Sequence, residues 1–230
     1  MKYLRLLPIA ILILNIGCQQ KAEKTNPESI FNEKDLTGWH LYNKDTLSSK
    51  WKVENGEIIC DPKKDGAYGD LITDNEYENF ELDFEWKVSK GGNSGVFINV
   101  KEDSSYAATF ATGLEMQLLD NANAEQRHQI DSTHWAGCLY AVECIGSNSK
   151  PNPFNNWNKG KIKQENGKVT FWLNDKVTFS NDVTTPDFKN KVAGTNMKNY
   201  PAFNTFRKGK IAFQNHTDSV GFRNISIKVL

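Results

Sequence analysis

The segment GLEMQLL, residues 113–119, carries a carboxyl and an amide two positions apart among apolar side chains. Alternate residues of a β-strand point to the same face, so Glu115 and Gln117 lie together, opposite the apolar members of the segment. With the apolar side packed inward, the strand would hold both groups rigidly, where they could bind a ligand's hydroxyl groups or transfer a proton. The alternative is that they form only the solvated face of an ordinary strand.

A second pair of polar side chains follows the same rule near the C-terminus. In GKIAFQNH, residues 209–216, Gln214 and His216 fall on the face opposite Ile211 and Phe213. Both are therefore further candidates for a ligand-facing surface. The alternative for His216 is a turn histidine that is hydrogen-bonded locally.

The last candidate strand, residues 220–230, changes the parity of its apolar side chains after Phe222. A β-bulge near Arg223 and Asn224 explains this change, and bulges often re-aim a side chain. Arg223 is therefore a third candidate for the site. An equally good alternative is that it holds the bulge through backbone carbonyl groups.

Strand patterns dominate the chain from Trp39 onward. Residues 78–89 alternate apolar and charged side chains, as expected for a strand with one buried face. The pattern recurs in residues 94–101, 113–119, 137–144, 167–175, 209–215 and 220–230. Asn55-Gly56 and Asn166-Gly167 mark tight turns of hairpins. No segment keeps a helical period for long, so we predict an all-β sandwich of two packed antiparallel sheets.

Three long irregular segments interrupt the strands: residues 120–136, 146–156 and 182–208. Loops of this length in a compact domain are usually functional or disordered. In the first of them, Asp120, His128 and Asp131 are candidates for a divalent metal site, although their spacing matches no specific metal motif. His134 either faces a ligand or caps the core. Trp157, just after the second segment, is expected to pack in the core.

Composition and cysteine content exclude some functions. The 230 residues include 28 basic and 28 acidic side chains and no basic run, which argues against a nucleic-acid partner. No pair of cysteines forms a CxxC motif, so a zinc knuckle is not expected. Cys138 and Cys144 share parity and could simply be buried in the strand predicted at residues 137–144. Cys60 could join a disulfide in an oxidising compartment.

The N-terminus predicts export. Lys2 and Arg5 precede an apolar run, residues 6–16, that is too short to span a bilayer. Gly17-Cys18 resembles the lipobox of bacterial lipoproteins, which implies a signal peptide over residues 1–17 and lipid on Cys18. An ordinary cleaved signal is the alternative. Residues 18–29 suit a flexible tether. We therefore expect a cell-envelope protein, anchored in the outer membrane, with one folded domain over residues 30–230.

Several segments occur in the order seen in a known family. They are FNEKDLTGWH, WKVENGEI, DLITDNEYENFELDFEW, GGNSGVFI, LEMQLLDN, AGCLYAV, NWNKGKI and IAFQNHTDSVGFRNISI. Together they resemble the 3-keto-disaccharide hydrolases, also described as 3-keto-glucoside 1,2-lyases and 3-keto-2-hydroxyglucal hydratases, over roughly residues 30–230. Two positions depart from the family: Asn215 stands where Asp is usual, and Asn99 where Arg is frequent.

The resemblance implies a concanavalin A-like jelly roll with a concave, sugar-binding face. It also implies cleavage of 3-keto-glycosides by β-elimination, followed by hydration of the 3-keto-2-hydroxyglucal to give net hydrolysis. Glu115 is then the base, and His216 or Arg223 stabilises the enolate or protonates the leaving oxygen. The candidate substrate-binding residues are Gln117, Gln214, Tyr140, Asn93, Asp120 and His134. No cofactor is expected beyond the candidate metal ion.

Other functions remain open at this point. A direct glycosidase needs two carboxyl groups flanking the scissile bond, for which Asp120 or Glu143 would have to partner Glu115. A non-catalytic carbohydrate-binding lipoprotein would use the same concave face, and a structural envelope domain would bind no sugar. Turnover and binding measurements distinguish these alternatives.

Overall fold

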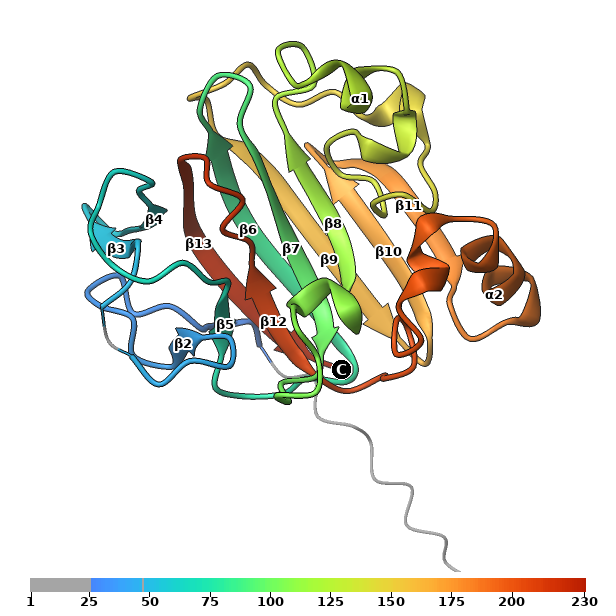
Figure 1. The fold of residues 1–230 in the computed structure, drawn as a ribbon, viewed down its shortest axis with the longest axis horizontal. Coiled ribbons are helices and arrows are strands. Elements are labelled where there is room, and N and C mark those ends of the chain that lie inside the picture. Colours follow the sequence, from blue (N-terminus) through green and yellow to red (C-terminus); the bar gives the residue numbers. More distant parts are fainter. Residues whose placement is uncertain (1–25, 47) are drawn as a thin grey trace, which may run out of the picture.

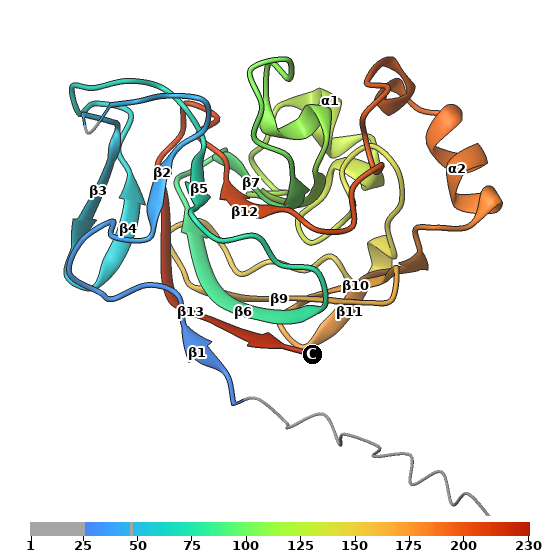
Figure 2. The same ribbon diagram turned by 90° about the horizontal axis from the view of Figure 1, so that it is seen from below.

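The protein is a sandwich of two antiparallel sheets, which confirms the predicted all-β, concanavalin A-like jelly roll. The computed structural model describes residues 26–46 and 48–230. Figure 1 views the two layers from one side, and Figure 2 shows them edge on. The predicted signal peptide and the lipidated Cys18 lie outside the described residues and stay predictions. Within the described part of the chain, no helix is long and apolar enough to cross a membrane.

The larger sheet has eight strands. In spatial order they are β11 (Lys176–Asp182), β10 (Lys168–Leu173), β9 (Asn158–Glu165), β6 (Phe80–Val88), β13 (Val220–Val229), β4 (Glu57–Cys60) and β3 (Trp51–Glu54), with β1 (Glu28–Ser29) paired to β13. Because Glu28 pairs with Ile227, the folded domain includes residues assigned to the tether and begins before the predicted boundary at residue 30.

The smaller sheet has five strands. Their spatial order is β2 (Trp39–Leu41), β5 (Leu71–Thr73), β12 (Lys210–Phe213), β7 (Asn93–Val100) and β8 (Leu114–Leu119). One face of this sheet packs against the larger sheet, and the other is covered by loops that contain short helices. The short helices of the domain are η1 (Thr109–Ala111), α1 (Gln126–Gln129), η2 (Ser132–His134), η3 (Gly146–Asn148), α2 (Pro186–Ala193) and η4 (Asn196–Asn199). Of these, η3 and α2 lie beside β11 of the larger sheet. In Figure 2, α1 lies on the side of β7 and β12 that faces away from β9 and β10.

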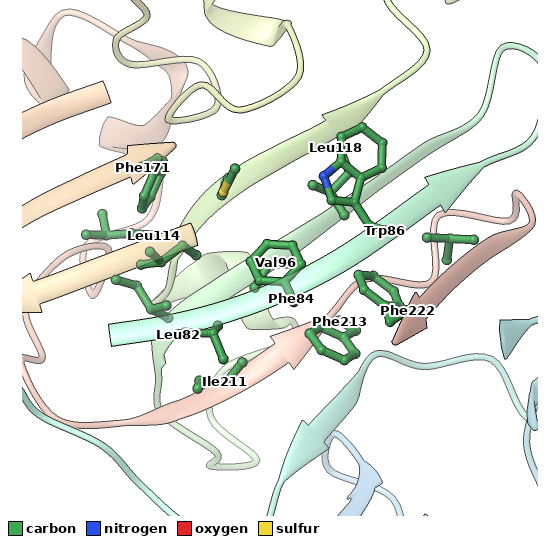
Figure 3. Packing of buried hydrophobic residues seen from close by; sticks show 14 of the residues in the cluster. Leu82, Phe84, Trp86, Val96, Leu114, Leu118, Phe171, Ile211, Phe213 and Phe222 are labelled. Atoms are coloured by element: carbon green, nitrogen blue, oxygen red, sulfur yellow. The ribbon is translucent and has the colours of Figure 1, made fainter. Parts of the chain in front are cut away.

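The core lies between the sheets and follows the period-two pattern of the sequence. Figure 3 shows Phe84 and Trp86 of β6 facing Val96 of β7 and Leu118 of β8. Each such side chain contributes about 1.5–3 kcal/mol when fully buried. Phe213 of the small sheet and Phe222 of the large sheet stack with ring centroids 4.0 Å apart. The inward packing of β8 forces its polar side chains to the opposite face.

Both predicted Asn-Gly turns are present. Asn55 and Gly56 have φ values of 53° and 75°, and Asn166 and Gly167 have 50° and 85°. Two consecutive positive φ values are what a type I′ hairpin turn requires. The turns join β3 to β4 and β9 to β10, and thereby fix the register of two hairpins in the large sheet.

The strand predicted over residues 137–144 is wrong. This segment is a compact loop closed by a disulfide between Cys138 and Cys144, with Cα atoms 4.8 Å apart. A strand would separate these positions by about 20 Å, at about 3.3 Å per residue. The expectation that both cysteines are simply buried thiols is therefore also wrong. Cys60 is a free, buried thiol rather than half of a disulfide, and burial raises its pKa to about 12.

Candidate functional site

Glu115 and Gln117 of β8 occupy the outer face of the smaller sheet, as their parity predicts. β7 pairs with one edge of β8, and Gly95 of β7 lies opposite Gln117. The Glu115 side chain extends across Gly95, and a Cβ at that glycine would lie 2.9 Å from its Cγ and Cδ atoms. The glycine in the motif GGNSGVFI therefore leaves the space that the carboxyl group occupies.

The disulfide-closed loop pairs with the other edge of β8. The amide of Tyr140 donates to the Glu115 carbonyl at 3.1 Å, and the amide of Gly137 donates to the Gln117 carbonyl at 2.7 Å. These bonds place the Tyr140 side chain beside Glu115 and Gln117. The predicted strand at 137–144 was wrong, but its Tyr140 reaches the site through these backbone contacts.

A cavity of about 220 Å³ lies over this face of the sheet. Ten residues line it: Asn93, Phe110, Glu115, Gln117, Tyr140, Asn196, Met197, Tyr200, Gln214 and His216. The structure thus brings together six of the side chains that the sequence predicts for the site. They come from β7, β8, the 137–144 loop and the segment after β12.

Glu115 is a buried carboxyl group without a counter-ion. Its side chain is 7 % exposed, and none of the described residues donates a hydrogen bond to its carboxyl oxygens. Burial raises the pKa of Glu115 well above its ordinary value, and the nearby charge of Asp70 raises it further. The protein therefore holds a carboxyl group that is a stronger base than usual once it is ionised.

Asp70 is a residue that the sequence does not reveal. Its carboxylate accepts hydrogen bonds from the Thr109 hydroxyl and from the Asn215 amide, both 2.5–2.9 Å away. Burial raises the pKa of Asp70 despite these bonds. It precedes β5, far from β8 in the chain, and only the assembled sheet places it close enough to act on Glu115.

Amide side chains form a second group in the cavity. Gln117 donates from Nε2 to Asn93 Oδ1 at 2.9 Å, and Asn93 Nδ2 lies 3.4 Å from His128 Nε2. Burial lowers the pKa of His128 to about 4, so this imidazole is neutral at physiological pH. Gln214 Oε1 is buried and has no hydrogen-bond partner among the described residues. The cavity therefore contains amide groups suited to bind hydroxyl groups.

Tyr140 and His216 are two further polar side chains of the cavity. Tyr140 stacks on His134 with ring centroids 4.7 Å apart and planes at 18°. Burial and the charge of Glu115 raise the pKa of Tyr140, so its hydroxyl stays a proton donor. His134 does not line the cavity, so the prediction that it binds substrate is corrected. Its ring instead packs against Tyr140 from outside the cavity. The His216 side chain is 43 % exposed and lies at the solvent side, 4.0 Å from Asp218.

Asp120 is a structural residue rather than part of the cavity, contrary to its assignment to substrate binding. Its carboxylate accepts from the Gly91 amide and from Asn123 Nδ2, which fixes the turn after β8. Asp131 accepts from the Thr133 amide and hydroxyl. No group of three or more His, Cys, Asp or Glu side chains gathers for a metal ion in residues 26–46 and 48–230. The predicted set of Asp120, His128 and Asp131 therefore does not come together.

Arg223 does not join Glu115, and its assignment as a catalytic residue is corrected. The predicted bulge is present in β13, as a register shift between Arg223 and Ser226. However, β13 belongs to the larger sheet, where Arg223 Nε bonds Glu85 Oε2 at 2.7 Å on the outer face. Its guanidinium covers Trp157, whose ring is 4.1 Å away. Trp157 is thus partly exposed outside the sheet rather than packed in the core, because the charged side chains of β6 and β13 surround it.

The sequence marked residues 182–208 as an irregular segment that is either functional or disordered, but it identified none of the other four lining residues. Phe110, Asn196 and Met197 reach the cavity from η1 and η4, and Tyr200 follows η4. Their segments have no strand period, so no parity argument could orient these side chains.

The chain is similar to a known domain family and to solved structures. Residues 26–228 match the model of the 3-keto-alpha-glucoside-1,2-lyase-like domain. The chain is 34 % identical to a 3-keto-disaccharide hydrolase of Bacteroides thetaiotaomicron, over 88 % of this chain and 78 % of the relative. A solved structure of a "putative glycosyl hydrolase" from Parabacteroides distasonis superposes with a TM-score of 0.78 and 32 % identity, covering 87 % of this chain and 92 % of that one.

A second Parabacteroides distasonis structure shares the fold, with a TM-score of 0.67 and 23 % identity over 89 % of this chain and all of that one. The family match covers both sheets and every lining residue of the cavity. The chain therefore belongs to the 3-keto-alpha-glucoside-1,2-lyase-like family.

Proposed function

We propose that the protein cleaves 3-keto-glycosides by β-elimination, with Glu115 as the base. The observation that carries the proposal is the buried carboxyl group of Glu115, which has no partner among the described residues and lies among amide side chains in a cavity. The family match and the name of the Bacteroides relative support the same substrate class.

The proposed reaction begins at C2 of the sugar. A ketone at C3 acidifies the C2 proton, because the electron pair left behind is delocalised onto the ketone oxygen as an enolate. The ionised Glu115 takes this proton. The enolate then collapses, so that a C1–C2 double bond forms, the C1–O bond breaks, and its electron pair leaves with the aglycone oxygen. General-base help of this kind is worth about 10²–10⁴-fold in rate.

Two neighbours of Glu115 suit the other roles. The Tyr140 hydroxyl and His216 can donate to the ketone oxygen or to the leaving oxygen, and an aligned donor is worth about 10²–10³-fold. In the hydration of the 3-keto-2-hydroxyglucal, a water molecule would add its oxygen to C1 and give its proton to the group that had protonated the leaving oxygen, while Glu115 returns a proton to C2. The sum of both steps is hydrolysis of the glycoside.

Aglycone release from a 3-keto-glucoside and from its unoxidised parent glycoside tests the proposal. We expect release from the keto sugar alone, and its loss in Glu115→Gln. The matched control is Glu85→Gln, which alters a carboxyl group on the outer face of the larger sheet. Saturable binding of either sugar without release would instead support a non-catalytic carbohydrate-binding protein.

A further inference from the structure

The floor of the cavity is polar, and two aromatic side chains lie at its opening. Asn93, Glu115 and Gln117 are each less than 10 % exposed, whereas Phe110 is 37 % exposed. Phe110 and Tyr200 contact each other edge to face, with ring centroids 5.1 Å apart and planes at 69°. The exposed polar side chains of Asn196 and His216 also line the cavity. A ligand that leaves the cavity therefore passes the aromatic pair on one part of the opening and these two polar groups on another.

The cavity is large enough for only part of a glycoside. Its volume of about 220 Å³ is below the roughly 300–1,000 Å³ of pockets that enclose drug-sized ligands. With the oxidised sugar ring beside Glu115, the aglycone has to lie at the opening. There it meets Phe110 and Tyr200 rather than the buried amide side chains of Asn93 and Gln117.

The aromatic pair is held in place by contacts between two loops. The Thr109 hydroxyl binds the Asp70 carboxylate, and this fixes η1 beside the smaller sheet. The amide of Asn204 donates to the Thr112 carbonyl at 3.1 Å, which ties the segment after η4 to the segment after η1. Phe110 and Tyr200 are thus pre-positioned, and little side-chain entropy is lost when a flat ring packs against them.

The chemistry of the site favours the same kind of aglycone. The ten lining residues include no lysine or arginine, and Arg223 lies on the other sheet. The leaving oxygen consequently depends on Tyr140 or the exposed His216 for a proton. A phenol has a pKa of about 10, far below that of water or an alcohol, so a phenolate leaves with less help from an acid.

We propose that Phe110 and Tyr200 form an aglycone clamp that makes the protein prefer phenolic 3-keto-glucosides over 3-keto-disaccharides. The proposal rests on the proposed function and deepens it by naming the substrate class. Aromatic rings pack favourably on such a pair, whereas the ring of Phe110 offers no hydrogen bond to the hydroxyl groups of a second sugar. Phe110 is then a specificity-determining residue rather than part of the elimination chemistry.

The test compares kcat and KM for a phenyl 3-keto-glucoside and a 3-keto-disaccharide, each in both anomeric forms. For the native protein we expect a higher kcat/KM with the phenyl compound. Phe110→Ala should raise KM for the phenyl compound about 10-fold or more, as expected for lost aromatic contact, and leave the disaccharide almost unchanged. Tyr68→Ala is the matched control, because Tyr68 is an exposed aromatic residue that does not line the cavity.

Each outcome of this test either supports or overturns the proposed aglycone clamp. Equal loss with both substrates, or no change in the phenyl-to-disaccharide ratio, overturns the clamp while leaving the elimination intact. If the native protein cleaves neither substrate, the proposed function fails, and calorimetric binding of the phenyl 3-keto-glucoside to the native protein and Phe110→Ala then tests the clamp alone. Weaker binding to Phe110→Ala but not to Tyr68→Ala would support it. Phe110→Leu, which keeps an apolar side chain, checks that any loss in Phe110→Ala does not reflect misfolding.

Discussion

The outer faces of the two sheets both carry acidic side chains, but the surroundings of these side chains differ. β6 of the larger sheet places acidic side chains at alternate positions, as β8 of the smaller sheet places Glu115. On the larger sheet these groups are paired: Asp83 lies 3.4 Å from Lys161, and Glu85 lies 2.7 Å from Arg223. Glu115 has no such partner among the described residues, because loops cover its face and Gly95 gives it room.

Both outer faces carry a hollow, so the size of the hollow does not identify the functional site. The faces differ in whether their carboxyl groups are paired with a basic side chain. The outer face of the larger sheet has the larger hollow, about 550 Å³, lined by Glu81, Asp83, Lys161 and their neighbours. Acid–base pairs that are partly exposed contribute about 0–1 kcal/mol each and leave no group free to react. A buried and unpaired carboxyl group is costly to fold, which is a reason to associate it with function.

Glu115→Gln should have the largest effect on turnover. It removes the proposed base and keeps the shape, so we expect kcat for a 3-keto-glucoside to fall about 10²–10⁴-fold. Glu85→Gln, the equivalent change on the other face, should leave kcat near that of the native protein. Equal effects of the two substitutions would remove the distinction between the faces.

Gly95→Ala should have the next largest effect. The new Cβ would collide with the Glu115 carboxyl group and displace it, and misplacement by about 1 Å can cost about 10²-fold in rate. Gly221→Ala is the control on the larger sheet, where the new Cβ meets the flexible Lys87 side chain. Steady-state kinetics of both variants measure the difference, and full activity of Gly95→Ala would contradict the placement of Glu115.

Glu115→Gln should also stabilise the fold at pH 7. Because the pKa of Glu115 is raised in the folded state, the folded protein keeps a proton that the unfolded chain releases as pH rises. The free energy of unfolding of the native protein therefore decreases as pH rises from the pKa of Glu115 in the unfolded chain to its pKa in the folded protein. A glutamine does not titrate, so the stability of the variant does not decrease in this way. Its Tm should exceed that of the native protein at pH 7 and match it near pH 4.

Thermal denaturation at the two pH values measures this difference, with about 2–4 °C in Tm for each kcal/mol. Glu85→Gln should show the opposite sign at pH 7, because it breaks a pair with Arg223. A lower Tm for Glu115→Gln at pH 7 would mean that contacts stabilise the ionised carboxylate.

Arg223→Ala should have the smallest effect. It removes the pair with Glu85 and the contact with Trp157, which together are worth about 1 kcal/mol at a partly exposed site. Turnover should not change, since Arg223 lies on the sheet that does not carry the cavity. Loss of turnover without loss of stability would restore the role that the sequence suggested for it.

Parity within a strand made much of the site predictable. Glu115, Gln117 and Gln214 face the cavity because their neighbours in the chain are apolar and pack inward. The two Asn-Gly turns follow from the same local reasoning. Parity assigns a side chain to a face of its strand, however, and does not say to which sheet the strand belongs. Arg223 was misplaced for this reason.

The remaining errors come from contacts distant in the chain. The 137–144 segment alternates like a strand, but positive φ values at Gly137 and Ala141 and the disulfide fold it into a loop. Asp70 acts on Glu115 only after β5 and β8 join one sheet. Phe110 and Met197 lie in loops, where no periodicity orients a side chain. Such residues become visible only in the assembled fold.

The most direct test of the proposed elimination follows the hydrogen at C2. A 3-keto-glucoside labelled with deuterium at C2 is incubated with the protein, and the sugar product is analysed by mass spectrometry, with a protein-free sample to correct for spontaneous exchange. The account predicts that deuterium is lost from C2 during turnover, wholly in any 3-keto-2-hydroxyglucal that forms, and that Glu115→Gln prevents this loss. Aglycone release that forms no 3-keto-2-hydroxyglucal and leaves all of the deuterium at C2 would show direct cleavage of the C1–O bond and would contradict the account.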